Sequence, residues 1–128
     1  MKLRIRGNSI RLRLTQSEVE HFAERGLIEE AVEFGTLKNQ RFIYALIIST
    51  EIEVPRAVLE NNRISVLVPK SEAAQWTSTN QVGISAEQHL AEDKTLRILI
   101  EKDFACLEER PGEDESDAFP HPQIGKMC

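Results

Sequence analysis

Hydrophobic and polar residues alternate along most of the first hundred positions. Residues 2–6 alternate aliphatic and basic side chains, and residues 9–14 do the same. A period of two is typical of strands that bury one face. Within the third such segment, Glu30 interrupts the apolar face formed by Ile28 and Val32. The pattern predicts strands over residues 2–6, 9–14, 28–35, 40–49, 51–59, 63–68, 81–87 and 95–102.

Helical spacing replaces the alternation in two short segments. The first helix is predicted from about Gln16 to Arg25, and Thr15 and Glu18 form a capping box at its start, in which each side chain bonds to the other residue's amide. Gly26 follows this helix and tolerates the left-handed conformation that ends many helices. The second helix, from about Ser71 to Trp76, is shorter.

Most of the stretch from Leu3 to Phe34 returns 54 residues later without a gap. Ile10 corresponds to Ile64 and Phe22 corresponds to Trp76, since both pairs differ by 54. A pattern that repeats at a fixed offset indicates a repeated structural unit. The alternative is the general likeness between any two strand–helix–strand units.

Turn residues fall at corresponding places in the two halves. Gly7-Asn8 in the first half corresponds to Asn61-Asn62 in the second, and both pairs suit a two-residue hairpin turn. Each unit therefore reads hairpin, short helix, strand, strand. We expect one domain over residues 1–107, made of two repeats at about 3–50 and 57–104, followed by an acidic, proline-containing tail over 108–128.

The connections between predicted elements are short or carry one helix, which favours antiparallel pairing. Eight antiparallel strands from a duplicated unit can close into a barrel that has no exposed edge. We therefore expect an α+β fold with an internal duplication. The strands would form a mainly antiparallel eight-stranded barrel or a strongly curled sheet, and the two helices would cover or plug it.

The order of elements over residues 2–102 resembles the CYTH-like triphosphate-tunnel fold, a wide eight-stranded barrel built from a duplicated β-α-β-β-β unit. That resemblance implies a first strand with an E-x-E-x-K motif, which holds metal and phosphate. Here the first strand reads Lys2-Leu3-Arg4-Ile5-Arg6. The nearest acidic pair, Glu51 and Glu53, is followed by Val54-Pro55 and lacks the lysine. The catalytic residues of that family therefore do not carry over.

The opening residues, KLRIRGNSIRLRLTQSEV, are similar to the start of a family of short bacterial proteins of unknown function. That resemblance spans the whole chain. It implies no activity, so candidate sites have to be argued from the residues themselves.

The composition is that of a soluble globular domain, with 41% hydrophobic and 29% charged residues in a chain of 128. No run of about 18 apolar residues predicts a membrane span, and the alternating start differs from a signal peptide. Two cysteines do not make a disulfide scaffold. These features predict a cytoplasmic protein, and the net charge of -5 argues against nucleic acid as a partner.

The candidate site is a basic hairpin at the start of the chain. Five cationic side chains project from one face of its two strands: Lys2, Arg4, Arg6, Arg11 and Arg13. Like charges in close array repel one another and need counter-charges, and guanidinium groups suit phosphate or carboxylate. The second repeat has Val58, Glu60, Ser65 and Leu67 at the corresponding arginine positions, so the repeated fold does not demand the array.

Two interpretations of this hairpin stay open. It binds an anionic ligand, possibly inside a tunnel, or it is a solvated face paired with glutamates of neighbouring strands or of the acidic tail. The tail holds six acids between Glu108 and Asp117, which could fold back as an anion mimic or serve only as a solubilising segment. If the tail occludes the hairpin, deletion of residues 108–128 raises anion affinity.

The sequence offers only weak metal candidates, and we expect no metal and no cofactor. Cys106, His121 and Cys128 match no common zinc spacing and are better interpreted as carrying free thiols and a lone imidazole. His21 and His89 have no cysteine or serine partner at a recognisable spacing, so we expect both at the surface. No residue is predicted to be catalytic.

Three functions follow from these observations. The first is a binding protein for a phosphorylated or other anionic ligand, which uses the basic hairpin and is not an enzyme. The second is a protein-interaction or structural module that docks a protein partner through the hairpin or the tail. The third is a divergent, metal-dependent phosphohydrolase of the tunnel type. A carboxylate cluster facing the arginines across a cavity would favour the third, and an exposed flat hairpin would favour the second.

Overall fold

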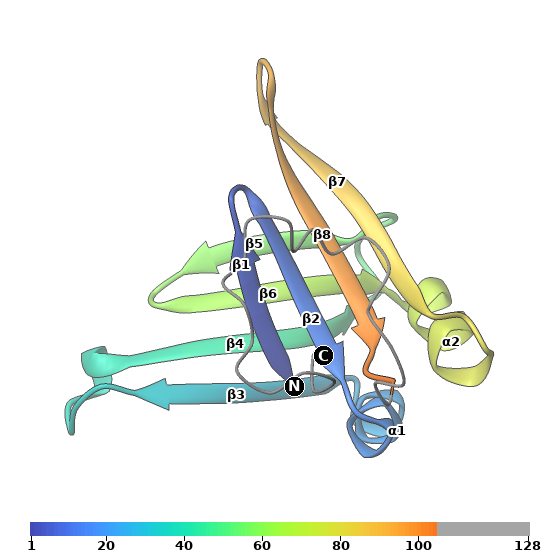
Figure 1. Cartoon of the computed structure of the whole chain (residues 1–128), viewed down its shortest axis with the longest axis horizontal. Helices are drawn as coiled ribbons and strands as arrows, with labels where there is room; N and C mark the ends of the chain where they lie inside the picture. Colours follow the sequence, from blue (N-terminus) through green and yellow to red (C-terminus); the bar gives the residue numbers. More distant parts are fainter. Residues whose placement is uncertain (105–128) are drawn as a thin grey trace, which may run out of the picture.

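The computed structural model describes residues 1–104, which form an α+β fold of eight strands and two helices (Figure 1). The strands are β1 (Lys2–Arg6), β2 (Ser9–Leu14), β3 (Leu27–Glu33), β4 (Arg41–Ser49), β5 (Arg56–Glu60), β6 (Arg63–Pro69), β7 (Gly83–Ala91) and β8 (Lys94–Lys102). The helices are α1 (Gln16–Arg25) and α2 (Lys70–Ser78), with a short 3-10 turn at Lys38–Gln40. The prediction of an α+β fold with two short helices is confirmed.

The strands form two separate four-stranded sheets. Sheet A has the order β1-β2-β8-β7, and sheet B has the order β3-β4-β6-β5. The two central pairs, β2–β8 and β4–β6, are parallel, and the other four pairs are antiparallel. The prediction of mainly antiparallel pairing is therefore confirmed. The strands of sheet A run across those of sheet B (Figure 1).

The prediction of one closed eight-stranded barrel is wrong. In each half of the chain, the helix carries the backbone from the hairpin in one sheet to the next two strands in the other sheet. Four strands, β1, β7, β3 and β5, are left as sheet edges among the described residues. The buried faces of the two sheets then pack against each other, as they do in a sandwich.

The pairing of the central strands repeats at the offset seen in the sequence. Ile10 of β2 lies opposite Ile98 of β8. Ile64 of β6 lies opposite Tyr44 of β4, so both partners differ from the first pair by 54. The two halves of the chain therefore exchange hairpins in an equivalent way, and each sheet contains one hairpin from each half.

The sequence analysis predicted a match between the halves without a gap, but the structure shows one. Leu27 of β3 lies opposite Ile47, and Gly83 of β7 lies opposite Glu101. Ile47 and Glu101 differ by 54, whereas Leu27 and Gly83 differ by 56. Two extra residues therefore lie between α2 and β7, and the structural partner of a β7 residue is found 56 positions earlier.

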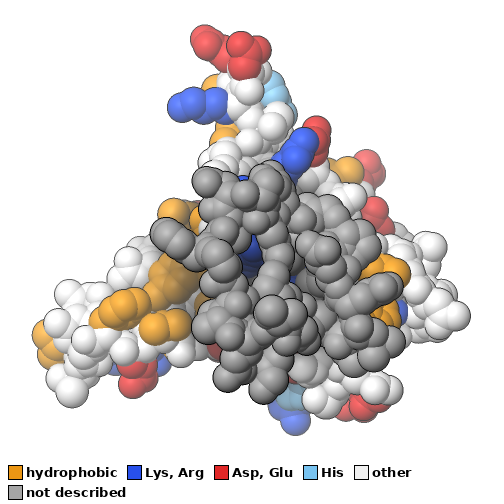
Figure 2. Space-filling model, viewed as in Figure 1, with side chains coloured by type: hydrophobic (Ala, Val, Ile, Leu, Met, Phe, Trp, Pro, Cys, Tyr) orange, Lys and Arg blue, Asp and Glu red, His pale blue; other side chains and the backbone are white. Residues whose placement is uncertain are grey.

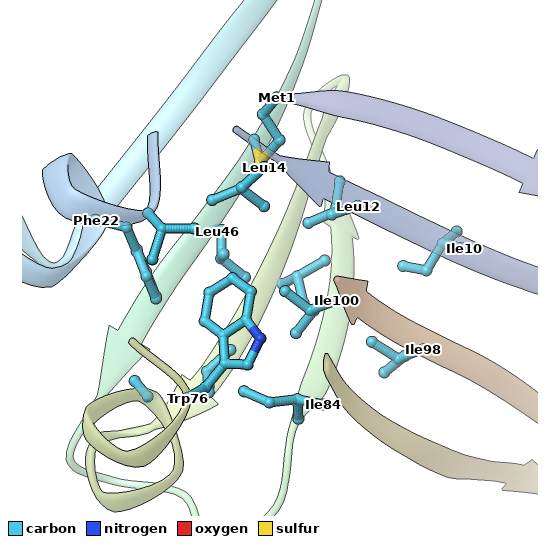
Figure 3. Close-up of a cluster of buried hydrophobic side chains, with 14 residues drawn as sticks. Met1, Ile10, Leu12, Leu14, Phe22, Leu46, Trp76, Ile84, Ile98 and Ile100 are labelled. Atoms are coloured by element: carbon cyan, nitrogen blue, oxygen red, sulfur yellow. The ribbon is translucent and has the colours of Figure 1, made fainter. Parts of the chain in front are cut away.

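The core lies between the sheets and is closed at one end by the helices (Figure 3). Leu12 from β2, Leu46 from β4 and Ile100 from β8 are almost fully buried. Phe22 of α1 and Trp76 of α2 are both fully buried and meet edge to face, with ring centroids 6.3 Å apart. These two aromatic residues, which correspond at the offset of 54, therefore anchor the two helices in the core.

The caps of α1 confirm the predictions made for that helix. The Thr15 amide donates to Glu18 Oε1 at 2.8 Å, and the Glu18 amide donates to the Thr15 hydroxyl at 3.4 Å. Gly26 ends the helix in the left-handed conformation, with φ of 71°. Local side-chain chemistry therefore fixes both ends of α1.

The largest differences from the predicted strand boundaries are at the start of the fifth strand and the end of the seventh. The fifth strand begins at Arg56 and not at residue 51, because Pro55 has no amide to donate to a ladder. The predicted polar loop from Gln88 to Lys94 is wrong, since β7 and β8 continue through it as a long hairpin that turns at Glu92-Asp93. Solvent on both faces explains the polar composition of this hairpin end, which projects beyond the rest of the molecule (Figure 1).

Candidate functional site

The predicted basic residues lie together on the outer face of sheet A. Leu3 and Leu12 take the opposite face of the same strands and pack against the core. Alternation along the strands then directs their basic neighbours away from the core. The register places Lys2 opposite Arg13, Arg4 opposite Arg11, and Arg6 opposite Ser9.

The parallel neighbour β8 adds a sixth cation that the sequence analysis missed. Arg97 lies opposite Ser9 and is therefore beside Arg6 across β2. No local signal could have identified Arg97, because its place depends on pairing between strands from opposite ends of the chain. We call the whole set the basic face: Lys2, Arg4, Arg6, Arg11, Arg13 and Arg97.

Three carboxylates provide part of the counter-charge. Glu101 Oε1 lies 3.3 Å from Arg11 Nε and 3.6 Å from Arg13 Nε, so one oxygen serves two guanidinium groups. Asp103 pairs with Lys2 at 3.3 Å. At the other end of the face, Glu87 pairs with Arg97 at 3.5 Å.

Among residues 1–104, the basic face gathers more cations than carboxylates. Six cations and three described carboxylates give a difference of three. Exposed ion pairs such as Arg97–Glu87 contribute about 0–1 kcal/mol each and weaken as salt rises. The predicted tail contact through residues 108–128 lies outside the described residues.

The idea that the arginines line the inside of a tunnel is wrong. Sheet A presents them on its outer face, because the inner face is occupied by the core residues Ile10, Leu12 and Leu14. Within residues 1–104, no group of three or more histidine, cysteine, aspartate or glutamate side chains could hold a metal ion. The basic face thus lies on the outer surface of sheet A and does not line a tunnel among the described residues.

The other sequence candidates fall in different places. His21 on α1 and His89 near the end of β7 are both exposed, which confirms that they are surface residues. Cys106, His121 and Cys128 lie outside the described residues. In the part of the chain that the structure describes, no helix is long and apolar enough to cross a bilayer.

A second charged cluster surrounds the amino group of Met1. This ammonium pairs with Glu18 and, at 2.9 Å, with Glu30. The Tyr44 hydroxyl oxygen lies 3.0 Å from the Met1 carbonyl oxygen and 3.2 Å from Glu30 Oε2. Both of these oxygens are placed to accept its hydrogen. Glu30 is the acid that interrupts an apolar strand face, and this interruption was the sequence signal for the cluster.

Electrostatics in the Met1 cluster favour the charged forms of the ammonium and of Glu18, and the neutral form of Tyr44. Burial opposes the charge of the Met1 ammonium, but its bonds with Glu18 and Glu30 outweigh burial and raise its pKa above the ordinary value of 8.0. Burial also opposes ionisation of Glu18, yet bonds from the ammonium and the Thr15 amide hold its pKa below 4.5. Burial and the charge of Glu30 raise the pKa of Tyr44. The cluster thus joins β1, α1 and sheet B.

The geometry first defines a class: a small α+β protein of two crossed sheets, one of which carries a basic outer face. Comparison with protein families then gives the particular family. Residues 1–123 match the model described as a family of unknown function (DUF7009), and the chain belongs to that family. No curated protein and no solved structure matches the chain.

Proposed function

We propose that the basic face binds an anionic ligand that carries phosphate or carboxylate groups. The observation that carries this proposal is the gathering of six cations on one sheet surface, where Arg11 and Arg13 share a single Glu101 oxygen. Guanidinium groups donate in a planar fork that suits both kinds of anion. The proposal is for binding, and it assigns no catalytic step.

The spacing of the cations favours an extended ligand with repeated charges. Cations two residues apart on one strand are separated by about 6.6–6.8 Å along it, and neighbouring strands lie about 4.8 Å apart. Arg4 and Arg11 form one row across the strands, and Lys2 and Arg13 form the next. A linear polyanion could therefore contact successive rows.

The test is a thermal-shift measurement with tripolyphosphate at low salt. A ligand at about a hundred times its dissociation constant should add about 2.7 kcal/mol to the free energy of unfolding. The double variant Arg4→Gln/Arg6→Gln should lose more than half of the shift. The matched control is Arg56→Gln, since Arg56 is exposed on β5 at the place of Lys2 in the other half.

The Arg56→Gln variant should keep the full thermal shift with tripolyphosphate. An equal shift in the double variant, or no shift in the unchanged protein with tripolyphosphate, pyrophosphate or sulfate, would count against the proposal. A thermal shift that persists at high salt would also argue against a ligand bound mainly by charge.

We further propose that the two halves of the chain derive from one duplicated unit. The equivalent registers of β2–β8 and β4–β6 support this, as do the matched buried residues Phe22 and Trp76. The four arginines of β1 and β2 have no arginine at the equivalent positions of sheet B, where Val58 and Ser65 lie opposite each other and only Lys2 keeps a basic counterpart, Arg56. The arginine-rich hairpin is therefore particular to the first half, as a function added to a shared scaffold would be.

A further inference from the structure

β1 is an edge strand, and alternate residues along it direct their backbone groups away from the sheet. The carbonyl oxygens of Asn8 and Leu14 accept from β8-side amides, at 3.1 Å from Arg97 and 2.8 Å from Asp103. The backbone N–H and C=O groups of even-numbered residues of β2 therefore point toward β8, and those of odd-numbered residues point toward β1. It follows that Lys2, Arg4 and Arg6 bond to β2, while Leu3 and Ile5 point their N–H and C=O groups outward.

The equivalent edge of sheet B, strand β5, is closed by a side chain. Ala57 corresponds to Leu3 at the offset of 54. The Ala57 amide donates to Gln88 Oε1 at 2.7 Å, and Gln88 Nε2 donates to the Ala57 carbonyl oxygen at 3.1 Å. The Gln88 amide thus makes the two bonds that a neighbouring strand would make.

The β1 edge has no such cap. Gln88 lies opposite Leu96, and Val32 lies opposite Phe42, so Val32 takes the place of Gln88 in the other half. Valine has no group that can bond to the backbone of Leu3. Among residues 1–104, nothing bonds to the outward amides of Leu3 and Ile5.

The side chains beside this edge differ on its two sides. On the outer side, Lys2, Arg4 and Arg6 give the edge three positive charges. On the inner side, the Ile5 side chain is 59% exposed. Sheet B also has exposed apolar side chains, among them Val32 of β3 at 44% and Leu59 of β5 at 70%. Figure 1 shows β1 crossing sheet B, and Figure 2 shows hydrophobic side chains gathered on sheet B to the left of that crossing.

We propose that the β1 edge binds an extended segment of a partner protein in which acidic residues alternate with apolar residues. The segment adds to sheet A as a fifth strand, with its backbone bonded to Leu3 and Ile5. Its acids face the three cations of β1, and its apolar residues contact Ile5 and the exposed part of sheet B. The inference rests on the proposed function for its charges and adds the backbone edge to it.

A second copy of this chain does not suit the same edge. Two antiparallel copies of β1 would place Lys2 against Arg6 and Arg4 against Arg4, with six cations on one face. Like charges directly opposite each other destabilise a strand pair. The charges therefore exclude self-pairing and select an acidic partner.

The experiment measures amide hydrogen exchange in the full chain with a synthetic peptide that alternates glutamate and valine. On binding, the amides of Leu3 and Ile5 should become protected. The amide of Leu59, which points outward from β5 in the same way, serves as the internal control and should not change. A peptide that alternates lysine and valine should protect neither edge.

A proline variant tests the backbone contact separately from the charges. Ile5→Pro removes an outward amide without removing a bond to β2, which edge strands tolerate. Peptide affinity should fall about tenfold or more, while the tripolyphosphate shift should persist. Leu59→Pro is the matched control at the equivalent position, and it should leave peptide affinity unchanged.

The outcomes separate this inference from the proposed function. Peptide binding without protection of Leu3 and Ile5 overturns the inference, and so does equal peptide affinity in Ile5→Pro. A tripolyphosphate shift with no peptide binding overturns the inference and leaves the proposed function standing. If Ile5→Pro does not fold, amide hydrogen exchange at Leu3 and Ile5 in the unchanged protein still tests the backbone contact.

Discussion

At the scale of single residues, the Met1 ammonium shows how charge and packing act together. Its side chain is buried in the core, while its amino group bonds to Glu18 from α1 and Glu30 from β3. Glu18 also completes the capping box with Thr15, so one carboxylate holds both the start of the helix and the start of the chain. The stability of this corner should therefore depend on the ionisation of Glu18.

The pH dependence has a defined sign. The pKa of Glu18 is lowered in the folded protein, so its contribution is complete above its ordinary 4.5 and is lost as pH falls through the folded value. The pKa of the Met1 ammonium is raised, so its contribution is complete below 8.0 and is lost as pH rises through the folded value. The pair should stabilise the fold most between these two values.

Glu18→Gln should lower the free energy of unfolding by about 1–2 kcal/mol at pH 6, because a glutamine keeps the capping box but loses the ion pair. Urea unfolding at several pH values measures the difference. The difference should shrink below pH 4.5 and above pH 8. Glu20→Gln, on the exposed side of the same helix, is the control and should have little effect. A difference that does not change with pH would contradict the assignment.

At the scale of elements, equivalent strands have different edges. β1 and β5 occupy equivalent places in their sheets, yet only β5 has its outward backbone closed, by Gln88 of β7. The two extra residues between α2 and β7 bring Gln88 to this position. The cap blocks the edge of sheet B at Ala57 against a further strand.

Removal of the Gln88 cap should destabilise the β5 edge. Gln88→Leu leaves the Ala57 amide and carbonyl without partners, which should lower the free energy of unfolding by about 1–3 kcal/mol. Hydrogen exchange at the Ala57 amide should become faster. Ser85→Ala, at an exposed position of the same strand, is the control. Unchanged exchange at Ala57 would show that the cap does not hold in solution.

At the scale of the whole molecule, local features were predictable and long-range pairing was not. The caps of α1, the two hairpin turns and the burial of Phe22 and Trp76 all follow from a few neighbouring residues. Alternation also assigned the basic side chains of β1 and β2 to one face. These properties depend on local chemistry and on period, both of which a sequence displays directly.

The division into two sheets depends on information that alternation does not carry. A period of two tells which face of a strand is buried, but not which strand lies beside it. β2 and β8 come from opposite ends of the described chain, and their parallel pairing replaces the expected barrel. Arg97 joins the basic face through this pairing alone, so the extent of the site could not be predicted.

The most direct test of the central claim is an NMR titration of the full chain with tripolyphosphate at low salt. Anion binding at the basic face predicts that amide shifts change along β1, β2 and the Arg97 end of β8, and that the changes fade as salt is added. The amide shifts of β5 and β6 should not change, because the equivalent hairpin of sheet B lacks the four clustered arginines of β1 and β2. Changes confined to sheet B, or no changes at all, would contradict the account.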